Sequence, residues 1–335
     1  MNEKINVVNW REERDIENPK GTVLRWLKEC EEIGIKPWEY DFKYEIYENS
    51  ILVEEMKDKP IELLLETWKD DKVYGYIKET EDSDLAQCIY KILWGFHSKN
   101  ASKYKDDVDA DVMNSFWYTF KYYLRSVDQV FVENGFNRDG PIKCDKGLGD
   151  DVTRGKFKDK YEGQFKLWEE TLGISKNFWL SFILDNIDYF LYADKLKVAS
   201  ELKKYAALTH TIGNFTLVPK GYNSGRGGND YWDYALEKMK NQDLSVFDGG
   251  FNHYIDNFHM SDYIKDDEVK PLMDQEKLRD KEKAKDEIES FLKKVNQNIE
   301  IRGKKMIEAL LQKLQEEFEG EDKVFLESYE KTLRK

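Results

Sequence analysis

Apolar residues recur every three or four positions along most of this chain, which is the spacing of helices with one buried face. The first such run consists of Val23, Leu24, Leu27, Cys30 and Ile33. Gly34 follows it, where a left-handed residue would end a helix. A second run begins after Ser83, a residue type suited to capping a helix, and contains Leu85, Cys88, Ile89, Ile92, Leu93 and Phe96. The sequence therefore predicts two helices within the first hundred residues.

Four further segments have helical spacing. One begins at Val112 and runs through Phe116, Phe120, Tyr123, Leu124, Val127 and Phe131 until Gly135 closes it. After Ser175 the segment FWLSFILDNIDYFLY is apolar nearly all round, so it predicts a central buried helix, and another helix is expected over about 196–208. A long amphipathic helix is expected near the end, over Ile288, Phe291, Leu292, Val295, Ile299, Met306, Leu310 and Leu314.

Two segments depart from this pattern. Residues 41–53, DFKYEIYENSILV, alternate apolar and polar side chains, which predicts a strand, with a short helix as the alternative. The stretch from Gly135 to Gly163 is rich in Gly, Asp and Lys and has no sustained apolar period, so it predicts a linker or a long surface loop. The expected organisation is a helical region over 1–135, a linker over 136–163 and a helical domain over 164–335.

Composition excludes several classes of protein. The chain has 335 residues, of which 40% are hydrophobic and 14% aromatic, enough for a sizeable core. Its longest apolar stretches, such as Phe178–Leu184, fall far short of the ~20 residues that span a bilayer, and the first residues contain no apolar signal core. Cys30, Cys88 and Cys144 stand far apart without CxxC spacing, which disfavours a disulfide framework. We expect a mainly α, cytoplasmic protein that does not bind membranes.

The segment 208–233, LTHTIGNFTLVPKGYNSGRGGNDYWD, is unusual in this helical chain. Phe215, Leu217 and Pro219 alternate with Thr216 and Val218, which predicts a short strand. A glycine-rich stretch from Lys220 to Gly228 follows, and a helix is expected to begin near Asn229 or Asp230. The predicted arrangement is a strand, a polar loop and a helix, with Trp232, Leu236 and Met239 on the inward face of the helix.

This arrangement resembles the latter half of a ββα-metal nuclease site, as found in the C-terminal HNH-type domain of GmrSD-like modification-dependent restriction enzymes. The resemblance rests on the run Gly213-Asn214-Phe215-Thr216-Leu217, on Asn223 in the following loop, and on Asn229 before the helix. The late stretch Ile299-Glu300-Ile301-Arg302 also looks like the terminal helix of that family, which carries an arginine. The resemblance covers roughly the C-terminal half, and it implies a small β-hairpin element there and a role in bacterial or phage defence.

The chain departs from the family at the catalytic centre. The family supplies an acidic-His pair in the preceding strand, where the His deprotonates a water beside a divalent metal. Residues 98–209 contain no histidine, and His210 lies on the other side of the motif. Either His210 has taken over as the base, or an aspartate such as Asp188 or Asp194 serves, or hydrolysis has been lost. We favour its loss over its retention; an active enzyme would use Mg²⁺ or Mn²⁺, and an inactive one no cofactor.

The remaining candidates are polar side chains of the same segment. His210, as the alternative base, and Asn223, from the resemblance, are the candidate catalytic residues, and Asn229 is a candidate phosphate contact. Arg226 lies among glycines that would let its guanidinium approach a phosphate, and an ordinary solvated arginine is the alternative. Asn214 is either a phosphate contact or a residue that bonds local backbone, and Asn223 either a ligand contact or a turn residue. Lys220 completes the predicted nucleic-acid-binding set.

Charge is unevenly distributed along the chain. The formal net charge is −14, which argues against broad nonspecific coating of DNA. Residues 195–240, however, hold eight Lys and Arg against four Asp and Glu, a local basic excess of the kind that a phosphate-binding surface needs. We therefore expect a degenerate or atypical HNH-nuclease-related protein that recognises nucleic acid or a phosphorylated ligand. The alternative is a non-enzymatic, acidic helical module that binds another protein, for which twenty tyrosines and nine tryptophans offer contact area.

Overall fold

The computed structural model describes residues 14–45, 80–98, 107–114, 200–222, 231–274, 276–277, 280 and 282–335. The predicted linker over 136–163, the predicted buried helix after Ser175, and Asp188, Asp194 and Cys144 lie outside these residues.

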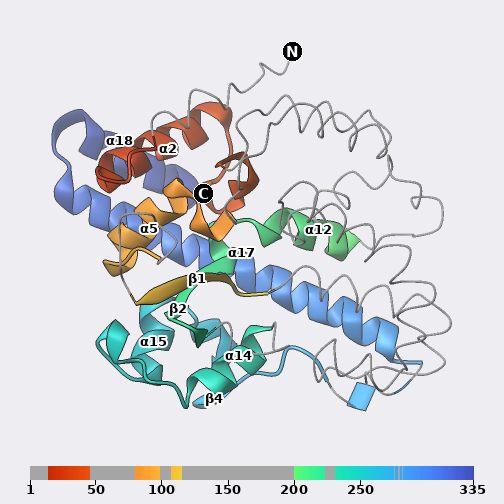
Figure 1. Ribbon diagram of the computed structural model, residues 1–335. Helices are drawn as coiled ribbons and strands as arrows, with labels where there is room; N and C mark the ends of the chain where they lie inside the picture. The colour runs from red at the N-terminus through yellow and green to blue at the C-terminus, as the bar shows by residue number, and fades with distance from the viewer. Residues whose placement is uncertain are drawn as a thin grey trace, which may run out of the picture.

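The described residues are mainly α-helical, with two small antiparallel two-stranded sheets (Figure 1). The helices are α2 (Pro19–Ile33), α5 (Asp84–Trp94), α12 (Ser200–Thr209), α14 (Trp232–Met239), α15 (Phe251–Asn257), α17 (Ala284–Glu317) and α18 (Gly320–Leu333). The strands are β1 (Val108–Val112), β2 (Phe215–Pro219), β3 (Ile264–Lys265) and β4 (Glu268–Val269). Short 3-10 turns join them: η1 (Pro37–Glu39), η2 (Phe42–Glu45), η3 (Thr80–Asp82), η6 (Ile212–Asn214), η7 (Ser245–Phe247) and η8 (Ser261–Tyr263).

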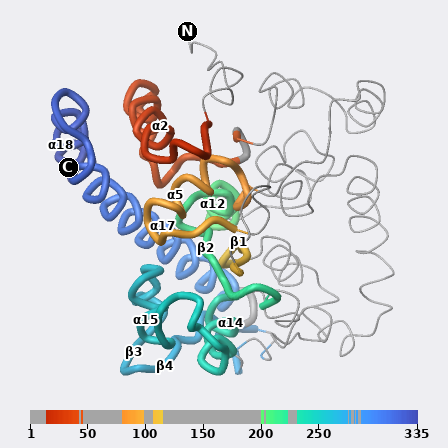
Figure 2. The backbone as a smooth tube through the Cα atoms, turned by 60° about the vertical axis from the view of Figure 1, so that its left-hand side comes forward, coloured from red at the N-terminus to blue at the C-terminus, as the bar shows by residue number. Residues whose placement is uncertain are grey.

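Helix α17 runs through the middle of the described residues and confirms the long amphipathic helix that the sequence predicts (Figures 1 and 2). Towards its C-terminal half it packs against α5 and α18, and nearer its N-terminus against α12. Its predicted apolar face is buried, from Ile288 to Leu314. None of the helices in the described residues is long and apolar enough to cross a membrane.

Local sequence explains where α2 and α5 begin and end. The Asn18 side chain accepts a hydrogen bond from Gly21 N, and Gly34, at φ 72°, ends α2 in the left-handed region. Ser83 caps α5 by accepting from Ala86 N, and Gly95, at φ 83°, ends it. Both predicted helices are confirmed, although α5 ends before Phe96.

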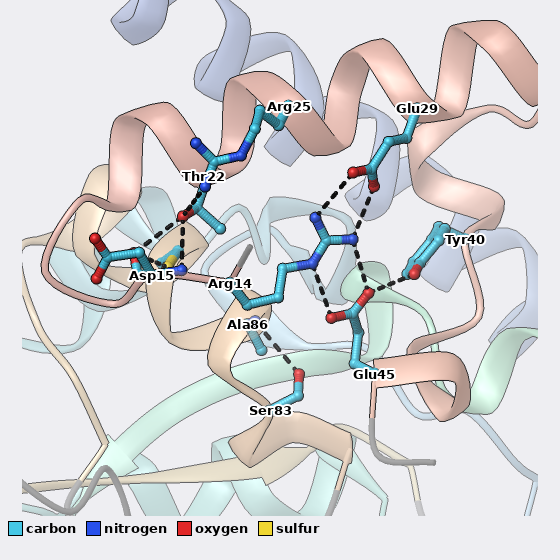
Figure 3. Close-up of polar contacts among 10 residues, drawn as sticks. Arg14, Asp15, Thr22, Arg25, Glu29, Tyr40, Glu45, Ser83 and Ala86 are labelled. Atoms are coloured by element: carbon cyan, nitrogen blue, oxygen red, sulfur yellow. Dashed lines mark hydrogen bonds and ion pairs between the residues drawn. The ribbon is translucent and has the colours of Figure 1, made fainter. Parts of the chain in front are cut away.

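A buried ionic cluster fastens α2 to the turn at η2 (Figure 3). Arg14 Nη2 lies 2.8 Å from Glu29 Oε2 on α2, and Arg14 Nε lies 3.0 Å from Glu45 Oε2 on η2. The Tyr40 hydroxyl donates to Glu45 as well. Residues 42–45 thus form a short 3-10 helix, the alternative to the predicted strand, and Glu45 of this turn pairs with Arg14. The rest of that predicted strand, 46–53, lies outside the described residues.

Strand β1 corrects a second prediction. Val112 was expected to begin a helix, but it is the last residue of a strand that pairs antiparallel with β2. The register places Val112 opposite Phe215 and Val108 opposite Pro219. Pairing with a segment about a hundred residues away creates this strand, since its two aspartates are poor strand formers on their own. The remainder of the predicted helix, from Phe116 onward, lies outside the described residues.

Strand β2 and helix α14 are both where the sequence predicts them. β2 covers Phe215–Pro219, and Trp232, Leu236 and Met239 of α14 are fully buried. The helix begins at Trp232, slightly later than expected, and its N-cap Tyr231 makes no side-chain capping bond.

Candidate site at the β1–β2 hairpin

Two aspartates, two positions apart, lie on one face of β1. Asp109 and Asp111 alternate with Val108, Ala110 and Val112, and successive side chains of a strand point to opposite faces. Their cross-strand partners on β2 are Val218 and Thr216, which share that face. Asp109 is 4% exposed and Asp111 6%. The hairpin therefore carries two nearly buried carboxylates beside the predicted polar loop.

The start of the loop is bonded to β1. The Asp109 carboxylate accepts a hydrogen bond from Gly221 N at 3.0 Å. Gly221 has a φ of 77°, a left-handed conformation that turns the chain away from β2 and favours glycine. Asp109 thus fixes the point where the loop leaves the sheet.

The end of the loop returns to the same strand. Asn114, two residues after β1, forms an isolated antiparallel bridge with Tyr231, the residue before α14. Asp109 and Asn114 are five residues apart in extended chain, roughly 17 Å at the usual rise of a strand. The segment before residues 223–230 is bonded to Asp109, and the segment after them is paired with Asn114. Asp111 lies between these two positions on the chain.

Lys220 is the exposed cation at the start of the loop. Its side chain is 58% exposed, and its Nζ lies 3.0 Å from Asp107 Oδ1. The hydrogen bond and charge of Asp107 raise the pKa of Lys220 above its usual value. Among the predicted contacts for phosphate, Lys220 is thus placed at the surface, where it pairs with the exposed carboxylate of Asp107.

The side chain of Asn214 is hydrogen-bonded to backbone groups near the two strands. It is fully buried, and its Oδ1 accepts from Asn114 N at 3.1 Å. Its Nδ2 donates to the carbonyls of Thr209 and Asn114, at 2.9 and 3.3 Å. Its amide therefore joins η6 to the end of β1 and presents no surface to a ligand, which matches the backbone-bonding alternative for this residue.

His210 is also interior. It is 2% exposed, its Nδ1 lies 2.8 Å from the hydroxyl of Thr80, and its carbonyl accepts from Phe42 N at 2.8 Å. These bonds connect α12, η3 and η2. A base that activates water at a phosphate needs access to that water, and His210 lies in a closed position between three elements.

The remaining predicted site residues, Asn223, Arg226 and Asn229, lie outside the described residues. Lys220 lies next to Gly221, which bonds Asp109 at the start of their loop. Asn214 bonds Asn114, which pairs with Tyr231 at the end of that loop. His210 directly follows α12 and lies two residues before η6.

Arg302 of α17 holds the start of β2 in place. Its Nη1 donates to the carbonyls of Gly213 and Phe215, at 2.9 and 2.5 Å, and its Nε donates to the carbonyl of Phe258 at 2.9 Å. The side chain is 1% exposed, and burial lowers its pKa to about 10. The arginine that contributes to the sequence resemblance therefore bonds the hairpin to the central helix.

No group of three His, Cys, Asp or Glu side chains with metal-site geometry occurs among the described residues. His253 is exposed on α15, and His259 is half-buried just after it. Burial and the nearby charges of Arg302, Lys305 and Lys313 lower the pKa of His259 to about 4. His259 therefore stays neutral at physiological pH.

Sequence reasoning missed the acidic strand. The run Val108-Asp109-Ala110-Asp111-Val112 has the apolar-polar alternation of a half-buried strand, and that alternation was the available signal. Its position before the predicted β2, with both aspartates on one face, would have identified it as the first strand of a hairpin.

No protein-family model, curated protein or solved structure matches this chain.

Proposed function

We propose that the β1–β2 hairpin and the loop leading to α14 recognise nucleic acid or a phosphorylated ligand. In this proposal the chain is a degenerate or atypical relative of HNH-type nucleases that serves in bacterial or phage defence. The loop supplies the contacts to phosphate, with Lys220, Arg226, Asn223 and Asn229 as its polar side chains.

One observation carries the proposal. A strand with two acidic side chains pairs antiparallel with β2, and the loop is anchored to that strand at Asp109 and at Asn114. Along the described residues β1 is followed by α12, η6, β2 and α14, so the two strands pair although α12 lies between them in sequence. In this proposal Asp109 and Asp111 stand on the strand for which the resemblance implies an acidic-His pair.

A divalent metal would find part of its ligand set here. Carboxylate oxygens suit Mg²⁺ and Mn²⁺, and Asp109 and Asp111 supply them from one face of β1. Asp109, however, already accepts a backbone hydrogen bond, and the described residues contribute no third acidic or His ligand. We therefore assign no hydrolytic step to the site, and we propose recognition rather than cleavage as its function.

Binding of a fluorescently labelled single-stranded oligonucleotide, followed by anisotropy at several salt concentrations, tests the proposal. Replacing Lys220 with Gln should weaken binding and reduce the slope of log affinity against log salt by about 1, as expected for one lost phosphate contact. Lys265→Gln, an exposed lysine on β3, is the matched control and should leave the slope unchanged. Equal slopes for all three proteins, or no binding by the wild type, would refute the proposal.

Plasmid incubation with Mg²⁺ or Mn²⁺ tests the assignment of recognition without cleavage. We expect no metal-dependent product from the wild type. A product that disappears in Asp111→Asn would instead show that the acidic strand supports catalysis.

A further inference from the structure

The exposed end of the β1–β2 hairpin presents a cation and an anion side by side. Lys220 Nζ lies 3.0 Å from Asp107 Oδ1, and the two side chains are 58% and 73% exposed. The backbone joins the same two residues, since Lys220 N donates to the carbonyl of Asp107 at 3.0 Å. A ligand that reaches Lys220 therefore also meets the Asp107 carboxylate.

The hairpin itself sets this arrangement. The strand before Lys220 is paired with β1 along its length, and Gly221 after it donates to the Asp109 carboxylate at 3.0 Å. The backbone of Lys220 is thus bonded to the residues just before and within β1. Its closeness to Asp107 is a consequence of strand pairing and does not depend on the side-chain ion pair alone.

The Asp107 carboxylate has acceptor capacity to spare. In the described part of the chain its side-chain contact is with Lys220, through Oδ1. An ionised carboxylate only accepts hydrogen bonds, and each of its two oxygens accepts more than one. A ligand that brings only phosphate oxygens to Lys220 is repelled by this carboxylate, whereas one that also brings a hydroxyl gains a charge-assisted hydrogen bond.

The covalent structure of a nucleic acid decides which of its donors reaches a carboxylate at this place. In RNA the 2′-hydroxyl is on the carbon next to the one that bears the 3′ phosphate, so both groups arrive together. Donors of the bases lie farther from that phosphate, beyond the sugar. DNA has no 2′-hydroxyl, and this group is what lets a protein distinguish RNA from DNA. A carboxylate that accepts from a ribose hydroxyl is also how dinucleotide-binding folds hold the sugar.

We propose that Asp107 makes the site selective for RNA over DNA, by accepting a hydrogen bond from a ribose 2′-hydroxyl beside the phosphate that Lys220 binds. This inference rests on the proposed function, because it requires a phosphate at Lys220. Both side chains are exposed to solvent, so the contribution is that of one ordinary hydrogen bond, roughly three- to tenfold in affinity.

Anisotropy with three labelled single strands of one sequence, composed of A and C only, tests the inference. The strands are RNA, DNA and RNA methylated at each 2′ oxygen, which cannot donate a hydrogen bond there. The wild type should bind RNA roughly three- to tenfold more tightly than either of the others. Equal affinities for all three strands would overturn the inference and leave phosphate recognition standing. No binding of any strand would overturn both.

Two variants assign the preference to Asp107. Asp107→Ala removes the acceptor and its charge, so this variant should bind RNA and DNA with nearly equal affinity. Glu268→Ala is the matched control, because Glu268 is 77% exposed and its Oε2 lies 3.0 Å from Nζ of Lys240. The control should keep the preference of the wild type. An unchanged preference in Asp107→Ala, or the same loss in both variants, would overturn the inference.

Discussion

At the scale of single residues, the buried charge of Arg14 is balanced by two carboxylates. Its guanidinium bonds Glu29 and Glu45, and the side chains of Arg14 and Glu45 are only 2% and 3% exposed. Both carboxylates approach it in the fork geometry that arginine favours (Figure 3). Burial lowers the pKa of Arg14, but the charge and hydrogen bond of Glu45 and the hydrogen bond of Glu29 outweigh this and raise it further above its already high value.

Arg14→Met should destabilise the protein by about 3–5 kcal/mol, because it leaves the buried Glu45 carboxylate without its cation. Urea unfolding measures this change. Lys20→Met is the control, since Lys20 and Glu317 pair at 2.7 Å with side chains 45% and 53% exposed, and its loss should cost less than about 1 kcal/mol. Equal losses for the two variants would contradict a dominant role for burial.

His259 makes stability depend on pH. Its pKa in the folded protein is about 4, against 6.5 for an ordinary histidine, because burial and three cations on α17 oppose its protonation. Between these values the unfolded chain takes up a proton that the folded one does not, so stability falls as pH drops from about 6.5 to 4. Because the ring is partly exposed, we expect this fall to be about 1–2 kcal/mol.

His259→Asn should remove that part of the pH dependence. Asparagine tolerates the positive φ of 56° at this position. Unfolding free energies at pH 4.5 and 7 for wild type and variant provide the measurement. His253→Asn, at an exposed position on α15, is the control and should behave as the wild type. An unchanged pH slope in His259→Asn would assign the dependence to other groups.

At the scale of elements, the hairpin is seated on α17 by a close approach of two backbones. A Cβ built on Gly213 of η6 would lie 2.1 Å from the carbonyl oxygen of Ile299 and 3.0 Å from Gly303 N. Gly303 in turn lies against Trp38. These two glycines let η6 approach the helix closely enough for Arg302 to bond the carbonyls on either side of Asn214.

Gly213→Ala should therefore destabilise the protein by about 2–3 kcal/mol, since backbone on both sides must shift. Chemical denaturation measures this, with Gly250→Ala as the control. Nothing lies within 4 Å of a Cβ at Gly250, so that substitution should cost no more than about 1 kcal/mol. A similar effect at both positions would mean that the approach of η6 to α17 tolerates a methyl group.

Helices that depend on local sequence patterns were predicted from the sequence. Pairing between distant segments was not. The capping residues Ser83 and Gly34 and the apolar stripe of α17 were enough to predict α2, α5 and the long helix. β2 was predicted from its alternation. β1 has a similar alternation, but its two aspartates disfavour a strand, and the pairing with β2 that stabilises it is not visible in the local sequence.

The same distinction holds for the candidate site. Lys220 was predicted and lies at the surface, next to the anchored start of the loop. Asn214 bonds Asn114, which follows β1, and His210 bonds Thr80 of η3. Asn114 and Thr80 lie outside 208–233, so the sequence of that segment left the roles of Asn214 and His210 open.

At the scale of the whole molecule, α17 unites the elements on which the proposed function depends. α12, η6 and η8 all pack on it, and the β1–β2 hairpin lies beside it, next to α14 and α15 (Figures 1 and 2). The central claim is that the loop held between Asp109 and Asn114 is where a phosphate-bearing ligand binds. The opposite end of the molecule, where α18 packs beside α2, provides an internal reference surface.

Hydrogen–deuterium exchange with and without a saturating single-stranded oligonucleotide tests that claim most directly, because it locates the binding surface along the chain. The account predicts slower exchange in peptides covering residues 219–231 and no change in peptides from α18. Protection confined to α18 and α2, or no change anywhere in the chain, would contradict it.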